Sequence, residues 1–271
     1  MKDADCVRFL QWFLPQNHMR WPGFRKVRSQ VCKRIAKRLE QLQIHNVEAY
    51  QGYLLQQPQE WFNLDKLCRV SISRFYRDKL VFTQLAQQVL PELAARAQAT
   101  EDKTVRVWSI GCGSGEEPYT LVILWQHLLA QNFPAIQLHV LATEVDPHLL
   151  ERCRHACYPA STIKNMPEAL RTVAFSRTDY QYCLKPAYKN TIEFEQQDIR
   201  KTMPEEQFNL ILCRNLVFTY FDLELQQKLL NELHSHLFPN GWLVLGVHEQ
   251  LPENTCGFSA VSLRFGFYQK S

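Results

Sequence analysis

The stretch VWSIGCGSGEEPYTLVILW, residues 107–125, joins an apolar run to three glycines within five positions, two glutamates and a second apolar run. A buried strand that passes through a glycine-rich turn into a helix is typical of nucleotide-binding α/β domains. Glu116 and Glu117 directly follow the turn, where their charge would repel a phosphate chain. The stretch therefore indicates an α/β fold with a ligand at this turn, and it favours a cationic group over a phosphate.

Strand-like and helix-like segments alternate after this stretch. Helical segments at residues 117–131, 147–155 and 223–237 separate the strand-like runs VRVWSIG, IQLHVLATEVD, NTIEFEQQDI, FNLILCRN and WLVLGVHE. This alternation predicts a mostly parallel, doubly wound sheet. The final runs FSAVSL and FGFYQK lie close together, so we expect the sheet to end in an antiparallel hairpin.

The first part of the chain is predicted to be helical. In VRSQVCKRIAKRLEQLQI, apolar residues recur at steps of three and four, which is the period of an amphipathic helix. Helical patterns continue over residues 46–55, 61–67 and 78–98, where Pro91 should kink or break the helix. We expect a small all-helical domain at residues 1–95 and an α/β domain at residues 96–271.

Composition and charge indicate an intracellular globular protein. Among 271 residues, 46% are hydrophobic and the net charge is +4. No apolar run reaches the ~18 residues that span a bilayer, and the N-terminal segment lacks a signal-peptide pattern, so the expected location is cytoplasmic. Residues 20–38 hold many lysines and arginines and no acid. Such a segment could face an acidic protein, a nucleic acid or only solvent. Nucleic acid is the less favoured partner, because no groove with interleaved aromatic residues accompanies the charges.

The nine cysteines show no CxxC spacing, and the pair nearest in sequence is Cys153 and Cys157. A structural zinc site needs four well-spaced ligands, which this pattern does not supply. We therefore expect reduced, mostly buried cysteines and no metal site.

Polar residues follow the predicted strands where each one ends. The glycines close the first strand, Glu144 and Asp146 the second, Asp198 the third and Asn215 the fourth. Carboxyl ends of parallel strands meet in one crevice, and an acid after the second strand there binds ribose hydroxyls. The turn has neither the GxGxxG spacing nor a GK[ST] ending. S-adenosyl-L-methionine, a nucleoside with a sulfonium and an amino group, fits this pattern.

Four segments carry a family resemblance. GCGSGEEPYTL resembles the first motif of the CheR family, methyltransferases that esterify glutamates of bacterial chemoreceptors. Three further segments are similar to other motifs of that family: SISRFYRDKLVFTQL, ATEVDPHLLERCRHACYPAS and FNLILCRNLVFTYFDLELQQKLLNELHSHLFPNGWLVLGVHE. The resemblance covers nearly the whole chain. It implies a class I methyltransferase fold, Rossmann-like, with a small β-insert near residues 179–194.

The resemblance also implies roles for particular residues. Arg77 and Tyr220 would act at the reaction centre, Glu117 would hold the amino group of the cofactor and Glu144 its ribose. The remaining implied cofactor-binding residues are Ser71, Ser73, Arg77, Gly111, Asp198, Ile199, Asn215 and Leu216. The implied partner is an acidic helical protein, docked by the basic helix at residues 25–38. Interdomain ion pairing for Arg77 and core packing for Tyr220 are the competing interpretations.

The chain departs from the family pattern beside the expected acceptor. Ser71 and Glu144 replace asparagine and aspartate, and one extra residue separates Asn215 from Tyr220. The acceptor therefore stays open: a glutamate of a protein, another protein site or a small molecule. A non-catalytic module that binds S-adenosylmethionine is the alternative from another class.

Overall fold

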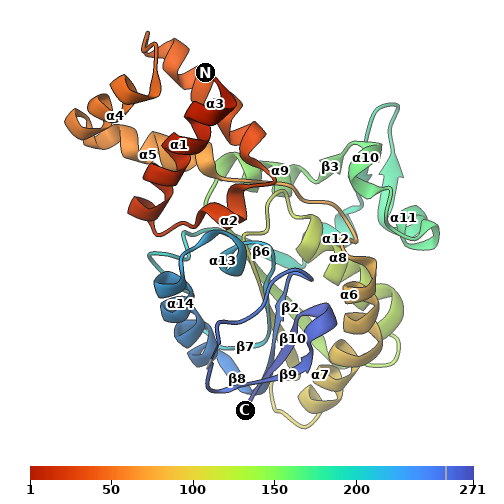
Figure 1. Ribbon diagram of the computed structural model, residues 1–271. Helices are drawn as coiled ribbons and strands as arrows, with labels where there is room; N and C mark the ends of the chain where they lie inside the picture. The colour runs from red at the N-terminus through yellow and green to blue at the C-terminus, as the bar shows by residue number, and fades with distance from the viewer. Residues whose placement is uncertain (254) are drawn as a thin grey trace. The chain divides into compact units, whose positions relative to one another are not determined.

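The computed structural model describes residues 1–253 and 255–271, and these form two compact units (Figure 1). The first unit contains Met1–Ser71 and Thr219–Gln226, and the second contains Ile72–Phe218 and Gln227–Ser271. Residues 79–97, most of which fall in the helical domain predicted from the sequence, belong to the second unit, where Leu90 and Leu93 are buried in its core. None of the helices in the described ranges is long and apolar enough to cross a membrane.

The first unit is built from short helices around an aromatic core. Phe9 stacks on Phe13 and on Tyr50, and Trp61 contacts Phe13. The predicted amphipathic helix is present as α3, with its apolar positions buried. The helices are α1 (Asp3–Phe13), η1 (Leu14–Asn17), α2 (Trp21–Phe24), α3 (Arg28–Gln41), α4 (Val47–Gln56) and α5 (Pro58–Cys68).

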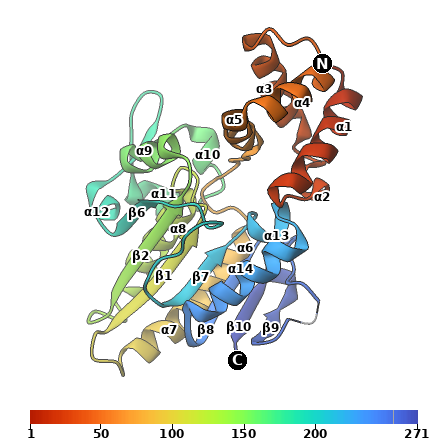
Figure 2. The same ribbon diagram turned by 90° about the vertical axis from the view of Figure 1, so that its left-hand side faces the viewer.

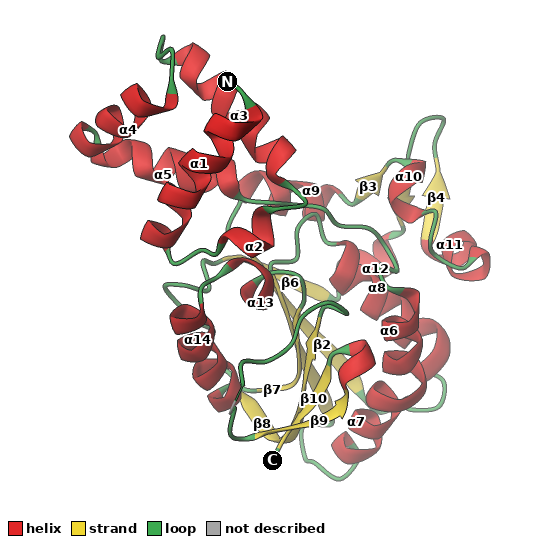
Figure 3. Ribbon diagram, in the orientation of Figure 1, coloured by secondary structure: helices red, strands yellow, loops and turns green. Residues whose placement is uncertain are grey.

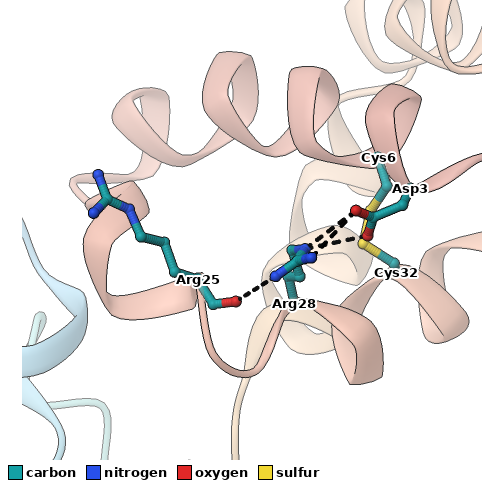
Figure 4. The surroundings of a disulfide bond; sticks show 5 residues. All are labelled: Asp3, Cys6, Arg25, Arg28 and Cys32. Atoms are coloured by element: carbon teal, nitrogen blue, oxygen red, sulfur yellow. Dashed lines mark hydrogen bonds and ion pairs between the residues drawn. A yellow bond between two sulfur atoms is a disulfide. The ribbon is translucent and has the colours of Figure 1, made fainter.

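Two disulfides contradict the expectation of reduced cysteines. Cys6 of α1 bonds to Cys32 of α3, beside the ion pair between Arg28 and Asp3 (Figure 4). The second disulfide joins Cys157 to Cys183. Each pair is 26 residues apart in sequence, so helix packing or strand pairing brings it together, and sequence spacing does not report such contacts.

The second unit confirms the predicted doubly wound sheet with an antiparallel end. Its strand order is β6-β2-β1-β7-β8-β10-β9. β10 runs antiparallel to both of its neighbours, whereas the other strand pairs are parallel. The strands are β1 (Thr104–Ile110), β2 (Gln137–Glu144), β6 (Ile192–Gln196), β7 (Phe208–Cys213), β8 (Leu237–Leu245), β9 (Phe258–Ser262) and β10 (Phe267–Lys270).

Helices cover both faces of this sheet. Figures 1 and 2 show α6, α7 and α8 along one face and α14 along the other. A single π-turn precedes Pro91, which therefore sits at the start of α7 rather than inside a regular helix. The helical segments are α6 (Lys79–Gln84), η2 (Leu85–Val89), α7 (Leu90–Ala97), α8 (Glu116–Leu124), η3 (Trp125–Leu129), α9 (Pro147–His155), α13 (Val217–Tyr220), α14 (Leu223–Ser235) and η4 (Leu263–Phe265).

A small three-stranded sheet lies apart from the main sheet of this unit (Figure 3). Its antiparallel order is β3-β5-β4, and the Cys157–Cys183 disulfide joins two directly paired residues of β3 and β5. The hairpin of β4 and β5 overlaps the predicted β-insert. The elements of this region are β3 (Cys157–Tyr158), α10 (Ala160–Ile163), α11 (Glu168–Ala174), β4 (Phe175–Arg177), β5 (Tyr182–Leu184) and α12 (Pro186–Lys189).

Candidate cofactor and reaction site

The site lies where the strand order of the sheet reverses, at the carboxyl end of β1 between β2 and β7. The amide groups of Gly111 and Cys112 donate to the Thr143 carbonyl, at 2.8 and 3.0 Å, which ties the glycine turn to the end of β2. Gly113 has a φ of +60°, and a Cβ there would lie 3.4 Å from the Cβ of Ser73. The turn therefore leaves a narrow space that a side chain would fill.

Glu144 is a buried carboxylate at the end of β2. It accepts hydrogen bonds from the amides of Gly113, Val145 and Asp146 at 2.8–3.0 Å. Burial raises its pKa above the ordinary value, against the effect of these three donors. A carboxylate offers about four lone pairs, so Glu144 can accept one more bond, as the ribose role predicted for it requires.

Glu116 occupies the first turn of α8 and is 3% exposed. Its Oε2 is buried and has no hydrogen-bond partner among the residues that the structure describes. Burial raises the pKa of this carboxyl, against the opposing effect of hydrogen bonding from its own backbone and from the Ser73 side chain. This oxygen lies 3.9 Å from the position of a Cβ on Gly113, so an acceptor without a partner faces the narrow space at the turn.

Glu117, which was predicted to bind an amino group, has protein partners. Its two oxygens accept from the Ser109 hydroxyl at 3.0 Å and from Nη1 of Arg214 at 2.9 Å. Arg214, whose side chain is 2% exposed, also pairs with Asp78 at 2.7 Å and lies over the ring of Phe82. This buried cation thus holds Glu117 and the segment at residues 77–78 together.

A second network joins Arg77, Asn215 and Glu249. Nη2 of Arg77 donates to Oδ1 of Asn215 at 3.0 Å, and Nη1 donates to the Ile72 carbonyl at 2.7 Å. The buried Glu249 accepts from the amides of Asn215 and Gly246 at 2.6 and 2.7 Å. The network fixes the end of β7 to the end of β8 and aims Asn215 at Arg77.

The other predicted site residues of the second unit also lie at strand ends. Asp198 follows β6 and forms an ion pair with Arg200 at 2.8 Å, while Ile199 is 6% exposed. A Cβ on Gly111 would approach Cδ2 of Leu216 at 2.7 Å, so Leu216 covers the start of the glycine turn.

Ser71 and Tyr220 belong to the first unit. Ser71 is exposed at its end, and the ring of Tyr220 packs edge-on against Phe24 with a centroid distance of 5.1 Å. The structure therefore brings most predicted site residues together in the second unit, and it places these two with the helical unit.

The basic run at residues 20–38 divides into two groups. Arg28 pairs with Asp3, Arg34 donates to the carbonyls of Leu67 and Arg69, and Arg38 forms two bonds with Glu60. These three arginines stabilise the helical unit itself. The other exposed basic residues are Arg25, Lys26, Lys33 and Lys37, together with Arg20, whose guanidinium donates to the Thr219 carbonyl.

Two functional candidates were missed from the sequence. Arg214 stands directly before the predicted Asn215, and Glu249 ends the strand-like run WLVLGVHE. An arginine in an otherwise apolar strand end was the available signal, because a buried charge needs a partner. Among the described residues, the site thus provides an oxygen of Glu116 without a hydrogen-bond partner, a lone pair of Glu144 that can accept a further bond, and N–H groups of Arg77 that can donate further bonds.

A family model, described as the CheR methyltransferase SAM binding domain, matches residues 71–267. The chain is 29% identical over 239 residues to the uncharacterized 104.1 kDa protein in the hypE 3' region of Rhodobacter capsulatus. It is 30% identical over 183 residues to the chemotaxis protein methyltransferase of Borreliella burgdorferi. These alignments cover 88% and 66% of this chain, and only 25% and 64% of the two relatives.

Among solved structures, the chain is similar to the glycopeptide N-methyltransferase MtfA complexed with S-adenosyl-L-methionine. The TM-score is 0.35 at 16% identity, and the match covers 64% of this chain and 56% of that one.

Proposed function

The chain belongs to the CheR methyltransferase family, and on that premise we propose that it transfers a methyl group to glutamate side chains of a protein acceptor. Residues 71–267 are an S-adenosyl-L-methionine-binding methyltransferase domain, and this molecule is its cofactor. The glutamate acceptor is our proposal. The observation that carries it is Arg77, a cation held by Asn215 and Ile72 that uses two of its five N–H donors on partners among the described residues.

The residues at the glycine turn fit the cofactor. The unpartnered Oε2 of Glu116 suits a primary ammonium, and the remaining lone pair of Glu144 suits a ribose hydroxyl. Glu117 already accepts from Ser109 and shares Arg214 with Asp78, whereas Oε2 of Glu116 has no hydrogen-bond partner among the described residues, so we propose Glu116 as the carboxylate that binds the amino group. Asp198, Ile199, Asn215 and Leu216 would line the rest of the cofactor.

Methyl transfer to a carboxylate makes few demands on the protein. When bound, the cofactor would supply a methyl group on a sulfonium, and the neutral thioether formed as the sulfur–methyl bond breaks is an excellent leaving group. A carboxylate is nucleophilic without a general base, so the enzyme mainly aligns the acceptor oxygen. We propose that the N–H groups of Arg77 without a partner in the described part of the chain hold the acceptor carboxylate through charge-assisted bonds, and that the hydroxyl of Tyr220 takes part on the acceptor side of the reaction.

The test of the activity uses methyl-labelled S-adenosylmethionine with helical cytoplasmic fragments of chemoreceptors or with small carboxylates. We expect label in the protein fragments that mild alkali releases, as it does from methyl esters. Arg77→Ala should lower kcat/KM by about 100-fold through lost alignment. Arg74→Ala, an exposed arginine three residues away, is the matched control and should stay within twofold. Base-stable label, or preferred methylation of small carboxylates, would refute the glutamate acceptor.

The proposed docking surface consists of the exposed cations Arg25, Lys26, Lys33 and Lys37, which favour an acidic partner. Lys33→Glu combined with Lys37→Glu should raise the KM for the protein acceptor and weaken its dependence on salt. Lys164→Glu combined with Lys228→Glu, at two exposed lysines of the second unit, changes the net charge by the same amount and is the control. Equal effects of the two charge changes would refute docking by α3.

A further inference from the structure

Residues 18–24 of the first unit pair with the segment that carries Tyr220. The pairing is antiparallel and involves the backbone of both segments. It consists of a bridge between Met19 and Phe221, a 2.8 Å hydrogen bond from the Arg20 amide to the Tyr220 carbonyl, and a 2.8 Å hydrogen bond from the Asp222 amide to the His18 carbonyl. The register of Tyr220 is therefore set by residues nearly 200 positions earlier in the chain.

Side chains strengthen this pairing on both sides of Tyr220. The Phe24 ring, 1% exposed, meets the Tyr220 ring at an interplanar angle of 62°. Nδ1 of His18 lies 3.1 Å from Oδ2 of Asp222, and the Arg20 guanidinium donates to the Thr219 carbonyl at 3.2 Å. Contacts therefore hold the backbone on either side of Tyr220, and one buried ring packs against the tyrosine ring.

The backbone of residues 219–220 approaches Gly23 so closely that a side chain would not fit there, and this contact, not the backbone conformation of Gly23, requires a glycine. A Cβ at this position would overlap the Thr219 carbonyl oxygen and would lie 3.2 Å from the Cα of Tyr220. Both neighbours are backbone atoms, which cannot swing aside as the end of a side chain can. Any substitution must therefore push the segment at residues 219–222 away from α2.

We propose that residues 18–24 are a positioning element for Tyr220, with Gly23 and Phe24 as the positioning residues that set its register and ring orientation. The inference rests on the proposed function, because it concerns the tyrosine assigned to the acceptor side of the reaction. An alignment-controlled reaction loses about 100-fold in rate for a displacement of about 1 Å.

The experiment compares Gly23→Ala with Gly52→Ala in the full chain. Gly52 lies in α4 of the same unit, and a Cβ there meets nothing within 4 Å. Gly23→Ala should lower kcat by about 100-fold while the Kd for S-adenosylhomocysteine, measured by calorimetry, stays within twofold. Gly52→Ala should leave both values within twofold. Unchanged kcat in Gly23→Ala would overturn the proposal.

A double-substitution cycle separates positioning of Tyr220 from general damage to the fold. In a Tyr220→Phe background, Gly23→Ala should cost less than threefold further, because the group that it displaces is already absent. A full 100-fold loss in that background would overturn the proposal. Phe24→Leu keeps an apolar side chain, lacks the ring contact, and provides the same test if Gly23→Ala does not fold.

A readout without catalysis distinguishes this inference from the proposed function. With 3-fluorotyrosine at position 220, the fluorine resonance should shift in Gly23→Ala and Phe24→Leu and stay in place in Gly52→Ala. If the resonance shifts in Gly23→Ala and Phe24→Leu but not in Gly52→Ala, and no methyl ester forms, the positioning element is supported and the proposed glutamate acceptor is refuted. If the resonance is unchanged in both variants, the positioning element is refuted whatever the activity.

Discussion

Arg214 is the buried charge on which the geometry of the site depends, and Arg214→Leu tests this directly. The substitution removes the partner of Asp78 and of Glu117, whose side chains are 27% and 15% exposed. It also removes a hydrogen bond to the Arg77 carbonyl and the contact with the Phe82 ring. Two carboxylates would then lie close together without a cation.

Loss of one partner from a buried ion pair costs about 3–5 kcal/mol, because the remaining charge stays desolvated. For a unit of this size, each kcal/mol lowers Tm by about 2–4 °C. We therefore expect Arg214→Leu to lower the Tm of the second unit by roughly 6–20 °C, measured by calorimetry at pH 7. It should also weaken S-adenosylhomocysteine binding, because the glycine turn loses its link to the segment at residues 77–78.

Arg106→Leu is the matched control. Arg106 also pairs with carboxylates in the second unit, but its side chain is 31% exposed and Asp102 lies at the surface. Solvent screens such a pair, so the control should shift Tm by a small fraction of the change in Arg214→Leu. If the two variants melt together, the buried network does not stabilise the unit and our reasoning about Arg214 is wrong.

Three further predictions concern charge and cross-links. Burial raises the pKa of Glu116, so folding favours its protonated form, and the contribution of Glu116 to stability falls as pH rises above 4.5. Glu116→Gln should therefore raise Tm at pH 8 and raise it less at pH 4.5. The same substitution should weaken S-adenosylhomocysteine binding. Burial of Glu60 would raise its pKa, but hydrogen bonds from Arg38, Asn63 and Tyr50 lower the pKa from 4.5 to about 2. Glu60→Gln should therefore destabilise the first unit by roughly 3 kcal/mol at pH 7 in urea titrations. The difference in stability between the two proteins should vanish as pH falls from 4.5 to 2. Each disulfide joins residues 26 positions apart, and the loss of chain entropy in the unfolded state gives such a cross-link about 3.5 kcal/mol of stabilisation. Cys6→Ser combined with Cys32→Ser should therefore lower the stability of the first unit by about 3.5 kcal/mol. An unchanged melting curve would contradict this prediction.

Much of the second unit could be predicted because its pattern is local. Strand-like runs, helical periods and the glycine turn are each visible within a window of about ten residues, and the observed β1, β2, β6, β7 and α9 follow them closely. Polar residues at strand ends gather because parallel strands point the same way. The cofactor class followed from the same residues, since carboxylates after a glycine turn exclude a phosphate chain.

The residues alone thus predict the α/β fold, the polar side chains at the strand ends and the kind of ligand. Tertiary packing decided the partners of the two glutamates: Arg214 reaches Glu117 from the end of β7, and Oε2 of Glu116 has no hydrogen-bond partner in the described part of the chain. Packing also decided that Cys6 meets Cys32, and that residues 219–226 belong with the helical unit. These outcomes depend on contacts between residues far apart in the chain, whereas periodicity and spacing report only on neighbours in sequence.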